Sequence, residues 1–357
     1  MPSSPHAASG RRIRLFHFNF WAGPLQDAGA FVDQLPGMDL SAKVANANDP
    51  EMLRMARLDC DWHGAITHVL SVIAHRDLEF LPTRVLGIQG VLDLARAVRP
   101  VDEEWWLIFQ GQEPQKLAGA LSKLLPFLAR NGVKVFFYAF DEASRTMPCF
   151  KDLAPHLNVF IHDEEPLDAQ GRALLSPRAR VIHRSWVANL VPFLIPFHQQ
   201  PDEKILFLGS KLGLTDHRKR QIAHLQKKFG DRFVAIHDHS VNVKELGSLN
   251  RFKVGLCPEG RKFTTPAMSA THTDRPFWSG CLGMVPVSED SKTGGRLESQ
   301  ASAGLLLRYA HGDLDALVAA CEQALAMPND ARRRIYDHFN RYETIGTVIA
   351  DAIAETP

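Results

Sequence analysis

The stretch "HTDRPFWSGCLGMVPVSED", residues 272–290, combines a helix start with a buried strand. Thr273 and Asp274 are residue types that cap helices, and Pro276 suits the first helical turn. Arg275 stands beside them, where a cation opposes the positive end of the helix dipole. The apolar run 284–287 then predicts a strand. An anion bound at the helix start would explain Arg275, and an ion pair with an acidic side chain elsewhere is the alternative.

The same change from strand pattern to helix pattern recurs along the chain. The runs "IRLFHFNF" (13–20), "VKVFFYAFDE" (133–142) and "KILFLGSKLG" (204–213) predict strands, and amphipathic runs such as 216–230 predict helices. This alternation is typical of the α/β class with parallel sheets. The proline-rich segment 191–203 separates two such series.

The chain is therefore expected to contain two doubly wound halves of similar size. The expected divisions are a disordered tail, an N-terminal domain, a C-terminal domain and a last helical segment that packs back on the N-terminal domain: residues 1–12, 13–195, 204–330 and 331–357.

Composition excludes several classes of protein. The formal net charge of +1 gives no overall field that would attract nucleic acid or an anionic membrane. Five cysteines without a CxxC pair argue against a disulfide framework and a zinc knuckle. No apolar run reaches the roughly 18 residues that span a bilayer. We expect a cytoplasmic protein without a membrane span.

Two loops after predicted strands are candidate ligand sites. In "FLGSKLGLTDHRKR" (207–220), Gly209, Ser210 and Lys211 join a strand to a basic helix that carries Arg218. Loop amides and a helix N-terminus attract phosphate. The run matches neither GxGxxG nor a Walker loop. A plain turn before a solvated basic helix is the alternative.

The second loop follows "VGLCPEGRKF" (254–263), which brings Pro258, Glu259 and Gly260 to the carboxyl end of an apolar strand. A carboxylate there can accept hydrogen bonds from a ribose diol. The basic residues that follow, Arg261 and Lys262, can meet phosphate. An ordinary strand-ending turn is the alternative.

The runs "VGLCPEG", "DRPFWSGCLGMVPVSED" and "GDLDALVAACEQAL" together resemble the C-terminal half of GT-B glycosyltransferases. More narrowly, they resemble the exostosin-like and bacterial spore-coat-type glycosyltransferases. The resemblance covers about residues 204–345 and rests on a short set of matches: Pro258, Gly260, Arg275, Phe277, Gly283, Pro286 and Val287. Family members commonly carry an acidic residue three positions after the arginine, where this chain has Trp278. Asp274 or Glu259 would have to replace it.

The resemblance implies two Rossmann-like domains that face each other across a cleft. The C-terminal domain would bind a nucleotide-diphospho-sugar, and the N-terminal domain an acceptor. GT-B enzymes stabilise the departing diphosphate with basic side chains and helix N-termini, so no metal and no obligatory cofactor is expected. The implied donor-binding residues are Gly209, Ser210, Lys211, Arg218, Pro258, Glu259, Gly260, Thr273, Asp274 and Arg275.

A catalytic base, if the enzyme inverts, is expected in the N-terminal half. Asp141 and Glu142 follow a strong predicted strand, His17 lies in the first one, and "HDE" (162–164) offers further side chains. A structural role is the alternative for each, and retaining chemistry would need no such base. The acceptor stays open among a glycan, a small molecule, a protein and a modified DNA base.

Two other functions fit the same pattern. One is a non-catalytic module that binds nucleotide-sugars without turnover. The other is a different two-domain α/β enzyme, such as a sugar-nucleotide epimerase, which would need no acceptor. His237 and His239 lie two apart on a predicted strand without a third ligand, so no metal site is expected there.

Overall fold

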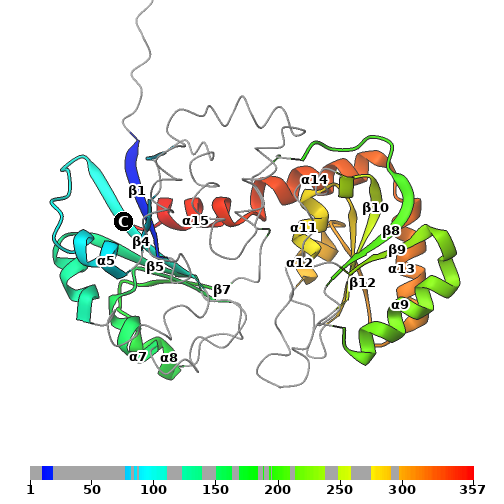
Figure 1. Cartoon of the computed structure of the whole chain (residues 1–357), viewed down its shortest axis with the longest axis horizontal. Coiled ribbons are helices and arrows are strands. Elements are labelled where there is room, and N and C mark those ends of the chain that lie inside the picture. The colour runs from blue at the N-terminus through cyan, green and yellow to red at the C-terminus, as the bar shows by residue number, and fades with distance from the viewer. Residues whose placement is uncertain are drawn as a thin grey trace, which may run out of the picture.

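The chain forms two α/β units, each built on a parallel sheet (Figure 1). The computed structural model describes residues 10–18, 77–81, 84–86, 88–110, 123–138, 150–162, 169–183, 188, 193, 195–209, 214–237, 248–258, 275–290 and 297–357. The α/β class with two parallel sheets is therefore confirmed. The cleft expected between the two units stays a prediction.

The first sheet has seven strands in the order β2-β1-β4-β5-β6-β7, with β3 also paired to β1. Every described pairing is parallel. The strands are β1 (Arg11–Phe18), β2 (Leu78–Phe80), β3 (Arg84–Leu86), β4 (Glu103–Gln110), β5 (Val133–Tyr138), β6 (Val159–His162) and β7 (Arg180–His183). Helical segments near them are α5 (Ile88–Leu94), residues 123–130, α7 (Phe150–Leu153), η2 (Ala154–His156) and α8 (Ala169–Leu174).

The second sheet has five parallel strands in the order β12-β11-β10-β8-β9. They are β8 (Asp202–Leu208), β9 (Phe233–Ile236), β10 (Phe252–Cys257), β11 (Val285–Glu289) and β12 (Leu307–Tyr309). The helices are α9 (Asp216–Phe229), η4 (Gly230–Arg232), α11 (Arg275–Cys281), α12 (Glu298–Ser302), α13 (Leu314–Ala326), α14 (Asn329–Tyr342) and α15 (Ile345–Ala354). The chain runs outward from β8 to β9, and in the other direction from β10 to β12. The switch point therefore lies between β8 and β10.

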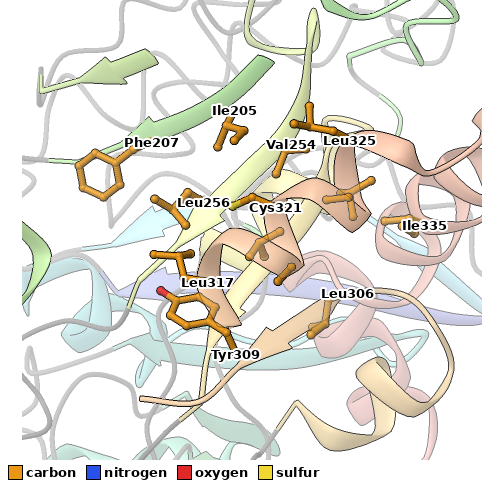
Figure 2. Close-up of a cluster of buried hydrophobic side chains, with 14 of the residues drawn as sticks. Ile205, Phe207, Val254, Leu256, Leu306, Tyr309, Leu317, Cys321, Leu325 and Ile335 are labelled. Carbon is orange, nitrogen blue, oxygen red and sulfur yellow. The ribbon is translucent and has the colours of Figure 1, made fainter. Parts of the chain in front are cut away.

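A continuous apolar cluster fills the second unit (Figure 2). Helix α13 begins at Asp313, whose carboxylate accepts a hydrogen bond from the amide of Ala316. Its buried face presents Leu317, Cys321 and Leu325 to the apolar strands, as the helical spacing predicts. Figure 2 shows these side chains beside those of the central strands β8 and β10.

Helix α11 lies unusually close to β10 because both carry small residues at their contact. A Cβ added at Gly255 would stand 2.2 Å from Ser279 Oγ. On the other side of the helix, a Cβ at Gly280 would stand 2.4 Å from the ring of Phe339 in α14. Helix α11 is thus held between β10 and α14, and its first residue has a defined place at the sheet edge.

The last helix, α15, covers one face of the first sheet (Figure 1). Its apolar residues join a cluster that includes Ile13, Leu15 and Trp106. Arg11 donates through Nη1 to the carbonyls of Ile353 and Ala354, at 3.2 and 3.3 Å. A cation at the carboxyl end of a helix satisfies free carbonyls and complements the dipole.

Strand β1 begins earlier than expected. Arg11 and Arg12 belong to the strand and not to the tail, because Arg11 pairs in register with Leu78 and forms an ion pair with Glu104, 2.6 Å from Nη2 to Oε1. None of the described helices is both long and apolar enough to cross a membrane.

Replacing Gly255 by alanine should lower the free energy of unfolding by about 1–3 kcal/mol, because the new methyl group overpacks the contact with Ser279. Ser279→Gly alone should cost about 0.5 kcal/mol, the difference in helix propensity between serine and glycine. The double variant should lose less than the sum of the two, since glycine at 279 removes the clashing atoms. Urea denaturation of the four proteins measures this coupling, and strict additivity would contradict the close contact.

A second prediction concerns Glu103, whose carboxylate accepts two hydrogen bonds from Arg14, at 2.7 and 2.8 Å, and one from Trp105 at 2.8 Å. The bonds from Arg14 outweigh the effect of burial and lower the pKa of Glu103 from 4.5 to about 2. The stabilisation is therefore complete above pH 4.5 and lost as the pH falls through about 2.

Glu103→Gln should lower the free energy of unfolding at pH 7 by about 1–3 kcal/mol. The difference in the free energy of unfolding between this variant and the wild type should become smaller as the pH falls from about 4.5 toward 2. The matched control is Glu79→Gln, which weakens an exposed ion pair with Arg12 and should change little. Urea denaturation at several pH values measures the free energy of unfolding of both variants. A difference between Glu103→Gln and the wild type that does not change with pH would contradict the lowered pKa of Glu103.

Candidate functional site

The candidate site lies at the carboxyl edge of the second sheet, at the switch point between β8 and β10. The register pairs Leu206 with Gly255 and Phe207 with Leu256, so the two strands end side by side. Gly209 follows β8, and Pro258 follows β10. In open parallel sheets, ligands bind beyond the carboxyl ends of strands at such a point.

Arg275 is the first residue of α11 and reaches the end of the neighbouring strand. Its Nε donates a hydrogen bond to the carbonyl oxygen of Leu208 at 3.1 Å. A guanidinium carries five N–H donors, and this bond uses one of them. Among the described residues, no carboxylate lies within ion-pair distance of Arg275. Its charge is thus placed at the edge of the sheet, beside β8.

Arg218 lies in the first turn of α9 and is almost fully buried. Its Nη2 donates to the carbonyl oxygen of Pro258 at 3.2 Å. Thr215 caps the helix, since its hydroxyl oxygen accepts from the Arg218 amide at 3.2 Å. The cap and the side-chain bond together fix the guanidinium at the end of β10.

Each of the two arginines contacts the strand that precedes the helix of the other. Helix α9 follows β8, yet Arg218 contacts the end of β10, and α11 follows β10, yet Arg275 contacts the end of β8. Helix α9 packs with α13, whereas α11 packs with α14, so the helices lie on opposite faces of the sheet (Figure 1). Two guanidinium groups therefore approach the switch point from opposite faces.

Gly209 lies close against the ring of Phe207 and beside Arg275. A Cβ at this position would stand 2.7 Å from Phe207 Cζ and 3.5 Å from Arg275 Nη2. The amide of Gly209, however, donates to the carbonyl oxygen of Ile236 at 3.0 Å. This amide is therefore engaged in the sheet, and the other loop amides that the sequence indicated lie outside the described residues. The guanidinium groups of Arg218 and Arg275 lie at the same edge.

Four of the ten expected donor-binding residues can be placed, and all four lie at this edge: Gly209, Arg218, Pro258 and Arg275. The other six lie outside the described residues: Ser210, Lys211, Glu259, Gly260, Thr273 and Asp274. Trp278 packs against the apolar clusters.

Of the expected catalytic residues, Asp141 and Glu142 lie outside the described residues. His17 is fully buried in β1, where it pairs in register with Val85 and Ile108. Because side chains alternate along a strand, it shares a face with Ile13 and Leu15. Its catalytic role stays a prediction.

Comparison with known proteins finds no matching family model and no matching curated protein. Solved structures do match. The avilamycin glycosyltransferase AviGT4 covers 96% of this chain and 96% of its own, with 12% identity and a TM-score of 0.47. The lipopolysaccharide outer core galactosyltransferase WaaB covers 97% and 100%, with 10% identity and a TM-score of 0.48.

A UDP-GlcNAc 2-epimerase from Neisseria meningitidis, bound to UDP-GlcNAc, covers 96% of this chain and 100% of its own, with 8% identity and a TM-score of 0.45. The GT-B prediction agrees with the kind of protein that the comparison returns, whereas the exostosin-like resemblance stays a prediction.

Arg275→Ala should weaken the binding of a nucleoside diphosphate by about 10- to 150-fold, the effect of losing a charge-assisted hydrogen bond worth about 1.5–3 kcal/mol. The matched control is Arg232→Ala. Arg232 also donates Nε to a carbonyl beside β8, that of Glu203 at 3.2 Å, but at the opposite end of the strand. Calorimetry with UDP, GDP, ADP and dTDP measures both variants. Equal losses, or no loss in Arg275→Ala, would remove Arg275 from the site.

Proposed function

We propose that the protein is a glycosyltransferase that moves a sugar from a nucleotide-diphospho-sugar to an acceptor. The observation that carries the proposal is the pair of arginines at the switch point. Arg218 and Arg275 are each fixed by a main-chain carbonyl at the ends of β10 and β8. Sugar transfer releases a nucleoside diphosphate, and guanidinium groups are the side chains best suited to hold phosphate.

The arrangement also suits the chemistry of the leaving group. Negative charge grows on the diphosphate as the glycosidic bond breaks, and donors that are already in position stabilise it without reorganising. Two basic groups provide this stabilisation, so we propose that transfer needs no metal ion and no cofactor beyond the donor. The acceptor would bind on the side of the first sheet, with the base, if one is used, drawn from that unit.

We also propose a cytoplasmic location. Its support is the cysteine content: Cys257, Cys281 and Cys321 are buried thiols outside any disulfide, and the sequence has no CxxC pair. Such scattered thiols are typical of proteins from reducing compartments.

A thermal-shift screen against sugar nucleotides, followed by a turnover assay, tests the proposed activity. One sugar nucleotide should raise the melting temperature, because a ligand that binds only the folded state stabilises it. Nucleoside diphosphate should then appear when a mixture of acceptor sugars is added, and added Mg²⁺ or Mn²⁺ should leave the rate unchanged.

Three results would overturn the proposal, each in favour of a different alternative. Conversion of the sugar nucleotide to an epimer without an acceptor would indicate an epimerase. Binding without any turnover across the acceptor mixture would indicate a binding module. An unchanged melting temperature with every sugar nucleotide would show that the proposed donor site does not exist.

A further inference from the structure

A second group of polar side chains lies at the same edge of the sheet, around Glu289. This residue ends β11, and its side chain is fully buried. Its Oε1 atom lies 2.6 Å from His217 Nε2 and 3.0 Å from His311 Nδ1. The same oxygen accepts hydrogen bonds from Gln221 Nε2 and from the amide of Gly312, both at 3.0 Å.

The three titratable residues come from separate parts of the chain. His217 lies in the first turn of α9, Glu289 ends β11, and His311 follows β12 in the turn before α13. The two imidazole rings stack, with centroids 4.5 Å apart and an angle of 23° between their planes. Among the described residues, this is the one group of three whose potential ligand atoms all lie within 4.8 Å of one another.

We propose that His217, Glu289 and His311 bind one divalent transition-metal ion, for which Zn²⁺ is the natural candidate. Two imidazole nitrogens with one carboxylate oxygen form a donor set that zinc accepts in proteins. Zinc bonds of about 2.0 Å place tetrahedral ligand atoms about 3.3 Å apart. The present separations from Glu289 Oε1, 2.6 and 3.0 Å, need to open by less than about 1 Å to reach that geometry.

The surroundings of the carboxylate hold it in position to bind a cation. A buried carboxylate is costly unless positive charge or hydrogen bonds compensate it. Gln221, itself almost fully buried, and the amide of Gly312 both donate to Oε1 and hold it in place. Outer hydrogen bonds of this kind orient the ligands of metal sites. Both histidines keep part of their side chains exposed, 21% for His217 and 25% for His311, which leaves a route for the ion.

The ion would have a structural role. It would tie the start of α9 to the end of β11 and to the turn before α13, three segments that the chain brings together from a distance. Arg218 follows His217 directly, so the ion would also steady the helix start that presents this arginine. The proposal stands apart from sugar transfer, since its ligands do not include the residues that contact Leu208 and Pro258.

Metal uptake by the full-length, untagged protein tests the proposal. After removal of metal and of chelator, the wild type should bind one equivalent of Zn²⁺, with a rise in melting temperature. Co²⁺ should bind the same site and give the visible absorption of a four-coordinate ion. His311→Ala and His217→Gln should weaken Zn²⁺ binding by more than about tenfold, since even outer-shell partners change metal affinity 10- to 100-fold.

The matched control is His338→Ala. His338 also faces a carboxylate, with Nε2 3.6 Å from Glu343 Oε1, but belongs to no described group of three ligands. This variant should bind Zn²⁺ like the wild type. Metal-free samples are compared by circular dichroism, so that lost binding is not confused with lost folding. Failure of the wild type to take up Zn²⁺ or Co²⁺, or unchanged affinity in His311→Ala, would overturn the proposal. Neither outcome decides the proposed function, because none of the three ligands is one of the residues proposed to hold the diphosphate.

Discussion

The contact between Gly255 and Ser279 sets the position of the candidate site. With no Cβ at 255, α11 packs directly on β10, and the ring of Phe339 presses on the opposite side of the helix at Gly280. The helix start cannot drift along the sheet, and Arg275 therefore meets the carbonyl of Leu208 at the end of the adjacent strand. The close packing of small residues thus gives the positive charge of Arg275 a defined position.

The carboxyl edge of the second sheet carries two groups of polar side chains. Arg275 and Arg218 stand at the switch point between β8 and β10, and the His217–Glu289–His311 group lies toward β11 and β12. Because α9 carries both Arg218 and His217 in its first turn, the two sites share one structural element. The stability of that helix start and the placement of Arg218 are therefore linked.

The alternation of strand and helix patterns was enough to predict the α/β class and most strand positions, since period-2 and period-3.6 burial are local properties of the chain. The start of β1 was missed because Arg11 and Arg12 are polar residues at the end of an apolar run. The residues that hold Arg11 in the sheet, Leu78 and Glu104, lie far along the sequence. The bond from the Gly209 amide to the carbonyl of Ile236 belongs to the β8–β9 ladder, which no local pattern shows.

The sequence by itself determined the helix start at Arg275, the small residues behind it and the glycine after β8, because caps, glycines and apolar runs act within a few residues. The tertiary structure alone decided that Arg218 contacts the end of β10 and Arg275 the end of β8. It also decided that His217 and His311 both contact one carboxylate oxygen of Glu289. These groups meet because parallel strands bring distant segments to one edge of the sheet. Such long-range contacts produce no recognisable pattern of spacing in the sequence.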